Sequence, residues 1–190
     1  LLKKPGINVT VVIPNKVPEN LRWLPCFEVV IEGLPKTEIQ KLLEPADFGI
    51  CVDFNQSSRV EKYSPLIENF NKPMILIDHH TNGKLKATIA FTEINVSSTC
   101  ELIHHLVKQL PALTVDVDYA TCIYTGIVTD TGVFSYSSSN VETFETVIDL
   151  LKLGINKDLI TQQIYNTQTE NRLRLLGHAL NDRLVMMSDI

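Results

Sequence analysis

The chain lacks several features that would assign it to a specialised class of protein. Its apolar runs stay well short of the roughly 18 residues that a membrane-spanning helix needs, so we expect no membrane partner. It contains no internal repeat and no low-complexity tract. Of its 190 residues 44% are hydrophobic and 21% are charged, a balance that excludes intrinsic disorder and predicts a folded core.

An excess of basic residues and a cysteine motif are also missing. The formal net charge of −5 argues against binding to the backbone of long duplex nucleic acid. The four cysteines form no Cys-x-x-Cys pair, which indicates reduced thiols in a cytoplasmic protein. The five histidines are too scattered for a dense zinc cluster. We interpret His104, His105 and His178, which lie in helical patterns, as packed or solvated side chains.

Strand patterns and helical patterns alternate along the first half of the chain, and helices dominate from residue 97 onward. The predicted strands are Asn8–Ile13, Val29–Ile31, Phe48–Val52, Met74–Ile77 and Thr88–Phe91. The predicted helices are Thr37–Leu43, Arg59–Phe70, Ser98–Gln109, Asp116–Val128, Glu142–Leu153 (followed by Gly154 as its capping glycine), Lys157–Tyr165 and Glu170 to about Met186. This alternation predicts an α/β fold with a parallel sheet that helices cover on both faces.

Three loops that carry an aspartate follow apolar segments of the chain. Asp53 follows one predicted strand, Asp78-His79-His80 follows the next, and Asp130 follows a helical pattern. Because the carboxyl ends of parallel strands meet at one edge of a sheet, we expect Asp53, His79 and Asp130 to converge there. Oxygen ligands with an imidazole favour Mn²⁺ or a similar ion over zinc. Two such ions about 3.5–4 Å apart would activate water for attack on phosphorus.

Each of these residues also has an ordinary structural interpretation when it is taken alone. An aspartate after a strand is most often a turn former or a helix N-cap, and Asp130-Thr131-Gly132 is typical of a turn. Asp78-His79-His80 differs because three polar groups sit at the end of a buried strand. Burying them costs free energy unless each finds a partner, and a divalent cation is a suitable one.

The three loops, in this order, resemble motifs of the DHH phosphoesterase superfamily. Val52-Asp53, Leu76-Ile77-Asp78-His79-His80 and the segment 126–132 are similar to its second, third and fourth motifs, and the segment 97–103 is similar to the stretch between the last two. The segment 13–25 resembles the branch of bacterial oligoribonucleases that also dephosphorylate phosphoadenosine phosphate. The resemblance implies a Rossmann-like, mostly parallel sheet followed by a helical segment. It implies an N-terminally incomplete phosphoesterase domain over residues 1–168 and a linker helix over 169–190, which leads to a C-terminal substrate-binding domain.

The resemblance also implies a metal site. Asp53, His79 and Asp130 correspond to its ligands, with Asp53 bridging two Mn²⁺ or Mg²⁺ ions in the complete parent protein.

Catalytic and substrate-binding roles are implied for five further residues. His80 would face the substrate phosphate, and Asp78 would orient an imidazole. Ser98 and Thr99 open a helix whose free N–H groups could hold a phosphate, and Arg59 could do likewise. For Arg59 and Ser98, a solvated charge and a plain N-cap are equally expected.

The function implied is metal-dependent hydrolysis of phosphodiester or phosphomonoester bonds in short oligonucleotides, cyclic dinucleotides or phosphoadenosine phosphate. A short nucleotide is then the expected partner, and a homodimer is compatible with the pattern. Two alternatives stay open: an inorganic pyrophosphatase-like hydrolase, and a catalytically inactive module for nucleotide binding or assembly.

We expect the chain as given to lack part of the site. The first motif of the family supplies a His and two Asp ligands ahead of a helix, and Leu1-Leu2-Lys3-Lys4-Pro5-Gly6 resembles the end of such a helix. Residues 1–190 should therefore bind Mn²⁺ weakly and hydrolyse nothing at a useful rate. Extension with the encoded upstream residues should restore hydrolysis of a dinucleotide or of phosphoadenosine phosphate. Full activity of residues 1–190 in a nuclease-free preparation would contradict this expectation.

Overall fold

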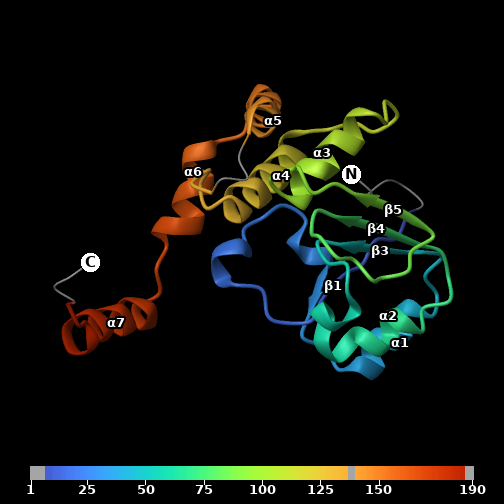
Figure 1. The fold of residues 1–190 in the computed structure, drawn as a ribbon, viewed down its shortest axis with the longest axis horizontal. Helices are drawn as coiled ribbons and strands as arrows, with labels where there is room; N and C mark the ends of the chain where they lie inside the picture. The colour runs from blue at the N-terminus through green and yellow to red at the C-terminus, as the bar shows by residue number, and fades with distance from the viewer. Residues whose placement is uncertain (1–6, 137–139, 187–190) are drawn as a thin grey trace.

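A computed structural model describes residues 7–136 and 140–186 and shows an α/β fold with a helical C-terminal part (Figure 1). The strands are β1 (Val11–Ile13), β2 (Val30–Glu32), β3 (Gly49–Val52), β4 (Met74–Asp78) and β5 (Ile89–Thr92). The α-helices are α1 (Lys36–Leu43), α2 (Ser64–Glu68), α3 (Thr99–Lys108), α4 (Val117–Asp130), α5 (Val141–Lys152), α6 (Lys157–Thr161) and α7 (Glu170–His178). Short 3₁₀ segments are Glu19–Leu21, Phe27–Val29 and Ser57–Tyr63, and single π turns are Gln162–Asn166 and Ala179–Arg183. The predicted helix end at residues 1–6 lies outside the described residues.

The strand pairings among the described residues are all parallel. β1 and β2 form a two-stranded sheet, and β3, β4 and β5 form a three-stranded sheet in that order. The α/β class and the parallel arrangement are thus confirmed. In the β3–β4 pair, Val52 stands opposite Ile77, so the two strands end side by side.

The two faces of the three-stranded sheet differ. On one face, Cys51, Met74 and Leu76 are buried against partly buried apolar side chains that include Phe54 and Phe70. The other face carries two apolar rows that the strand register aligns, and their outer members are exposed: Ile50–Ile75–Ile89 and Val52–Ile77–Phe91. The parallel pairing thus places apolar side chains on both sides of the sheet, as is typical of α/β folds.

A separate hydrophobic core holds the helical half together. Its most buried members lie on α4 and α5 and include Ala120, Ile127 and Leu150, all fully inaccessible to solvent. α3 packs against α4, and α3 also lies against β4. α3 therefore connects the helical core to the sheet.

The prediction of one continuous helix over Arg59–Phe70 is wrong. The pattern Arg59–Phe70 predicts a single helix, but the chain forms the 3₁₀ segment Ser57–Tyr63 and then α2. The break lies at Glu61, whose φ of +45° is outside the helical region. Pro65 explains the restart, because proline lacks an N–H and is tolerated only in the first turn of a helix. The predicted strand Asn8–Ile13 is also shorter than expected, beginning at Val11.

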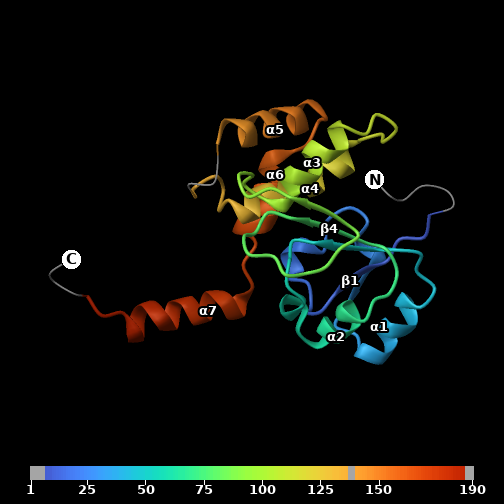
Figure 2. The same cartoon turned by 45° about the vertical axis from the view of Figure 1, so that its right-hand side comes forward.

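The C-terminal helix α7 extends away from the rest of the molecule (Figures 1 and 2). Its leucines and those of the following turn, among them Leu173, Leu176 and Leu180, are more than half exposed. No helix within the described ranges is long and apolar enough to cross a membrane. The predicted capping glycine after α5 is confirmed, since Gly154 adopts a φ of +88° that other residues rarely adopt.

Gly126 on α4 allows the close approach of α3, which gives a test of this packing. A Cβ atom at residue 126 would lie 2.1 Å from Cys100 Sγ and 2.9 Å from Cys100 Cβ. We expect Gly126→Ala to lower the free energy of unfolding by about 1–3 kcal/mol, the usual cost of overpacking a core. Urea unfolding followed by circular dichroism measures the change.

Gly177 provides the matched control. It lies inside α7 with open space around it, so Gly177→Ala should be neutral or slightly stabilising. Adding Cys100→Ala should recover part of the stability that Gly126→Ala loses, because it removes the closest atom. Equal stability of Gly126→Ala and the parent chain would contradict the packing described.

Candidate active site

The ends of β3 and β4 bring two acidic segments together. The amide of Asp53 donates a hydrogen bond to the carbonyl of Ile77 at 3.0 Å, which extends the strand pairing by one residue. Asp53 then turns the chain with a φ of +66°, a conformation that the short side chain of aspartate tolerates better than most. β4 ends in Asp78, and His79 and His80 follow directly. Asp53 therefore stands beside the two histidines.

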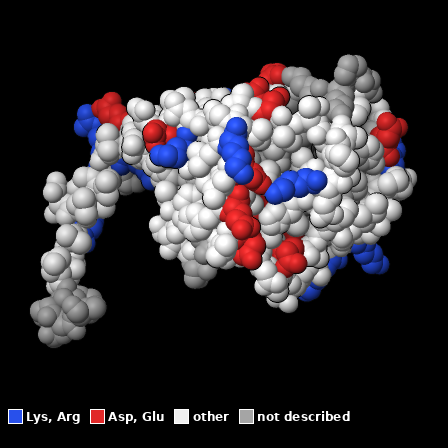
Figure 3. All heavy atoms as spheres, turned by 90° about the horizontal axis from the view of Figure 1, so that it is seen from above, with Lys and Arg blue, Asp and Glu red and all other residues white. Residues whose placement is uncertain are grey.

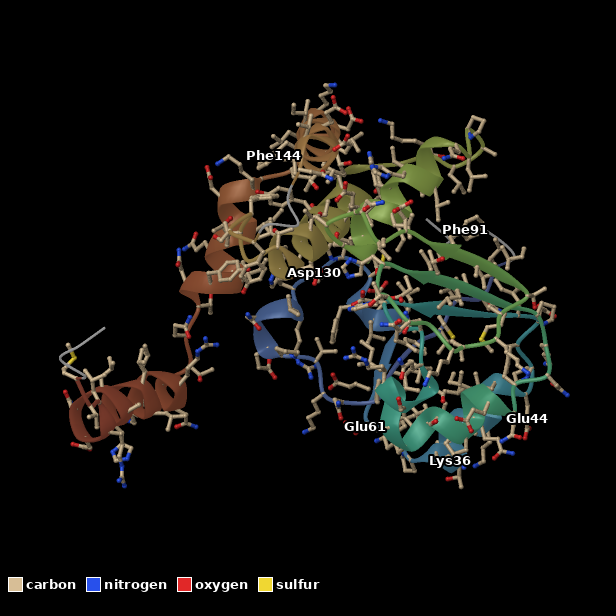
Figure 4. The ribbon with its side chains drawn as sticks, viewed as in Figure 1. Lys36, Glu44, Glu61, Phe91, Asp130 and Phe144 are labelled. Atoms are coloured by element: carbon tan, nitrogen blue, oxygen red, sulfur yellow. The ribbon has the colours of Figure 1, made fainter. Side chains whose placement is uncertain are left out.

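His79 lies between two carboxylates. Its Nε2 atom is 3.8 Å from Asp53 Oδ1 and 3.3 Å from Asp130 Oδ2. Asp53, His79 and His80 each place one donor atom within 4.8 Å of one another, an arrangement that could hold a metal ion. Asp130 comes from the last residue of α4, where that helix meets the sheet half of the molecule (Figure 4). His79 thus lies beside both Asp53 and Asp130, the residues that the resemblance implied as its fellow ligands, whereas the group whose donor atoms are all mutually close contains His80 in place of Asp130.

The ring of His79 is suited to a cation. Its Nδ1 lies 3.5 Å from the carbonyl of Val96, a long contact that favours a proton on Nδ1. Its Nε2 is buried and makes no hydrogen bond within the described part of the chain. An unpaired lone pair on a buried ring nitrogen, with two carboxylates beside it, matches the donors that Mn²⁺ and related ions accept.

Asp130 is placed where a negative charge is unfavourable without a cation. It is the last residue of α4, where the helix dipole is itself negative, and no basic residue lies in that turn. Burial raises the pKa of Asp130, and the nearby charge of Asp53 raises it further, against an opposing effect of His79. Burial raises the pKa of the neighbouring Cys100 thiol to about 12, with both carboxylates adding to the shift. Cys100 therefore stays protonated beside this group of charges.

Asp78 and His80 hydrogen-bond to each other at the end of β4. The Asp78 side chain is fully inaccessible to solvent, and its Oδ1 lies 2.8 Å from His80 Nδ1. Asp78 Oδ2 also accepts a hydrogen bond from the His80 amide at 3.2 Å. These contacts orient the His80 ring, which remains 41% exposed and packs edge-on against the ring of His79. Asp78 thus holds an imidazole in place, as the sequence pattern implied.

The start of α3 supports Asp53. The hydroxyl of Thr99 donates a hydrogen bond to Asp53 Oδ1 at 2.7 Å. Ser98 is a buried N-cap that accepts a hydrogen bond from the amide of Glu101, so its side chain has the ordinary capping role. The fully buried Glu101 accepts hydrogen bonds from Ser97 and from Thr143 on α5. A network of buried side chains thus fixes the turn that presents Thr99.

Other residues lie outside this group. Arg59 is exposed, and its guanidinium forms no hydrogen bond or ion pair within the described ranges, as expected for a solvated charge. His104 is buried with its Nδ1 3.0 Å from the Tyr119 hydroxyl, and His105 contacts Thr146. His178 on α7 is exposed and pairs with Asp182. These histidines are packed or solvated, as predicted.

Three residues near the site have no role in the sequence pattern. They are Asn55, two residues after the second motif, and Cys100 and Glu101, which lie in the segment 97–103. Asn55 stands in the polar stretch Asn55-Gln56-Ser57-Ser58, so its sequence context does not distinguish it from a loop residue. The others resemble ordinary helix residues until α3, α4 and α5 are assembled.

Comparison with known proteins adds to this geometry. Residues 1–127, two thirds of the chain, match the model of the DHH family, N-terminal domain. This chain belongs to the DHH family. The resemblance drawn from the ordered motifs is thereby confirmed.

Its relatives include both curated proteins and a solved structure. The chain is 31% identical over 153 residues to a bifunctional oligoribonuclease and PAP phosphatase of Mycoplasma pneumoniae, which covers 80% of this chain and 45% of that protein. It is 26% identical over 164 residues to the protein of the same name from Thermus thermophilus, covering 86% and 47%. A crystal structure of an exopolyphosphatase-related protein from Bacteroides fragilis superimposes with a TM-score of 0.86 at 35% identity, covering 94% of this chain and 53% of that one. The chain thus spans about half the length of these relatives.

The contact between Asp78 and His80 predicts a single tautomer for the His80 ring. Because Asp78 can only accept, Nδ1 of the neutral ring should carry the proton and Nε2 should be free. Long-range ¹⁵N–¹H correlation spectra distinguish the two tautomers. Asp78→Ala should allow the proton to exchange to Nε2, whereas the spectrum of the exposed His178 should not change. A proton on Nε2 of neutral His80 in the parent chain would contradict this prediction.

Proposed function

We propose that this DHH-family chain forms the phosphoesterase part of a metal-dependent hydrolase acting on short oligonucleotides, cyclic dinucleotides or phosphoadenosine phosphate. The observation that carries the proposal is the unpaired Nε2 of His79 beside the carboxylates of Asp53 and Asp130. A ring nitrogen 3.8 Å from one carboxylate and 3.3 Å from another, with no lysine or arginine paired to either carboxylate within the described residues, favours a divalent cation. The names of the curated relatives support the substrate class.

Asp53, His79 and Asp130 would hold Mn²⁺ or Mg²⁺ in this site, and His80 offers a further donor atom nearby. When bound, ions of this kind polarise phosphoryl oxygens and lower the pKa of water. Asp53 is suited to the bridging position, because its side chain is 58% exposed and one of its oxygens is already oriented by Thr99. Its second oxygen accepts no hydrogen bond from the described residues.

The His80 ring is partly exposed to solvent, so a substrate can reach it. Asp78 engages its Nδ1, so Nε2 is the nitrogen that remains for a ligand. When this ring is protonated, its Nε2–H can donate to a phosphate oxygen on which negative charge grows during attack. His80 is thus proposed as the residue that stabilises the transition state.

The surface charge supports a small substrate. On the face seen in Figure 3, basic and acidic side chains lie intermixed among uncharged residues, and the described part of this face carries no continuous basic track. A long duplex would require many phosphate contacts by Lys and Arg, which a chain with a net charge of −5 does not favour. Neutralising one or two phosphates at a metal centre requires no such surface.

A second candidate is the hydrolysis of phosphoanhydrides such as polyphosphate. The likeness to the Bacteroides fragilis protein, which is described as exopolyphosphatase-related, favours it. The same metal donors would serve either reaction. Parallel assays of inorganic polyphosphate and of a diadenosine dinucleotide, with released phosphate and released nucleotide measured separately, distinguish the two.

The proposed division of labour predicts different outcomes for Asp53 and His80. In a form of the protein competent for hydrolysis, Asp53→Ala should abolish both Mn²⁺ binding and turnover, because it removes charge from the metal site. His80→Ala should lower turnover by roughly 10²–10³-fold and leave Mn²⁺ affinity nearly unchanged. Calorimetric titration with Mn²⁺ and steady-state kinetics separate the two effects.

His178→Ala serves as the matched control, since it removes an exposed histidine far from the site and should change neither quantity. If His80→Ala abolished Mn²⁺ binding while His79→Ala left it intact, the roles of the two histidines would have to be exchanged. Absence of Mn²⁺ and Mg²⁺ binding by the protein without substitutions would refute the proposed function itself.

A further inference from the structure

Asn55 is a buried polar residue that forms hydrogen bonds with the loop after β4, residues 80–85. It lies two residues after Asp53 and is only 4% exposed. Its Nδ2 donates to the carbonyl of His80 at 2.9 Å and to that of Thr81 at 3.2 Å. Both side-chain N–H donors are thereby used on the loop that follows β4.

The backbone of Asn55 binds the same loop further along. Its carbonyl accepts hydrogen bonds from the amides of Lys84 and Leu85, both at 2.9 Å. The loop also closes tightly over the side chain, because a Cβ atom at Gly83 would lie 3.1 Å from Asn55 Cβ. Residues 80–85 therefore wrap around the side chain of Asn55, which lies three residues after β3.

This arrangement holds His80 from two sides. Asp78 accepts a hydrogen bond from the His80 amide, and Asn55 donates to the His80 carbonyl. Without Asn55, the carbonyls of His80 and Thr81 would lose the donor that ties them to the segment after β3 and would bond to water instead. The least costly response is for the loop to move towards solvent, which carries the histidines away from Asp53.

We propose that Asn55 is a positioning residue that sets the separation between Asp53 and the pair His79-His80. Its side-chain hydrogen bonds go to backbone carbonyls of the loop and not to a carboxylate or a ring nitrogen, so its effect passes through the loop. The effect of Asn55 on metal binding and catalysis rests on the proposed function. The coupling of the two segments can be measured without any metal.

The first experiment measures amide hydrogen exchange. The amides of Lys84 and Leu85 donate to the backbone carbonyl of Asn55, which Asn55→Ala retains. If the side chain holds the loop, these amides should exchange faster in Asn55→Ala, by about tenfold for each 1.4 kcal/mol of lost restraint, while amides in α4 should not change. Asn55→Ser, which keeps one hydroxyl donor, should give an intermediate rate and serves where the alanine variant folds poorly. Unchanged exchange at Lys84 and Leu85 in both variants would overturn the proposal.

The second experiment measures Mn²⁺ affinity by calorimetry. Loss of a residue that orients ligands typically costs about 10–100-fold, and we expect Asn55→Ala to fall in that range. Asn69→Ala is the matched control, because Asn69 makes the same kind of amide-to-carbonyl bond, to Pro65, at an exposed position that follows α2. It should leave Mn²⁺ affinity unchanged.

A double-mutant cycle tests whether Asn55 acts through the histidines. In a His79→Ala background, Asn55→Ala should have little further effect on Mn²⁺ affinity, because the ligand that it positions is gone. Fully additive losses would overturn the proposed route. If the protein without substitutions bound no Mn²⁺, the proposed function would fail. Faster exchange at Lys84 and Leu85 in Asn55→Ala would still support the positioning role of Asn55.

Discussion

The parallel register of β3 and β4 is the constraint on which the site depends. Val52 stands opposite Ile77, and the amide of Asp53 continues the ladder by bonding to the carbonyl of Ile77. Side chains alternate between the faces of a sheet, so a slip by one residue would move Asp53 away from His79 and also expose the buried side chains of the strand. The burial of Cys51 and Leu76 therefore holds the two acidic segments in their relative positions.

The charges at this edge are balanced by their surroundings only in part. Asp78 is paired with His80, and Thr99 satisfies one oxygen of Asp53. Asp130 lies at the unfavourable end of α4, against the helix dipole, and burial raises its pKa. A site that collects negative charge in a partly buried place is less stable alone than with a cation, which is the physical reason for the proposed metal dependence.

The supporting side chains form a second layer around the proposed donors. Asp78, Thr99 and Asn55 each bond to a residue of the group or to the loop that carries it, and Glu101 fixes the turn before Thr99. These four residues are 4% exposed or less. Their burial removes competition from water, so each hydrogen bond restrains one rotamer or one loop. The positions of the proposed donors are thus fixed by hydrogen bonds from buried polar side chains.

The fold class, most of the element order and the candidate donors could be predicted from local patterns, whereas the meeting of distant segments could not. Strand patterns followed by acidic residues are local signals, and three separate motifs in the right order were specific enough to identify the family. Thr99, by contrast, reaches Asp53 across 46 residues, a contact that depends on how α3 packs on the sheet. Asn55 acquires its role because residues 80–85 fold around it, and the helix predicted over Arg59–Phe70 breaks where Glu61 leaves the helical region. Local pattern predicts which residues carry charge and which are buried, but the partner of each polar group is chosen by packing across the chain.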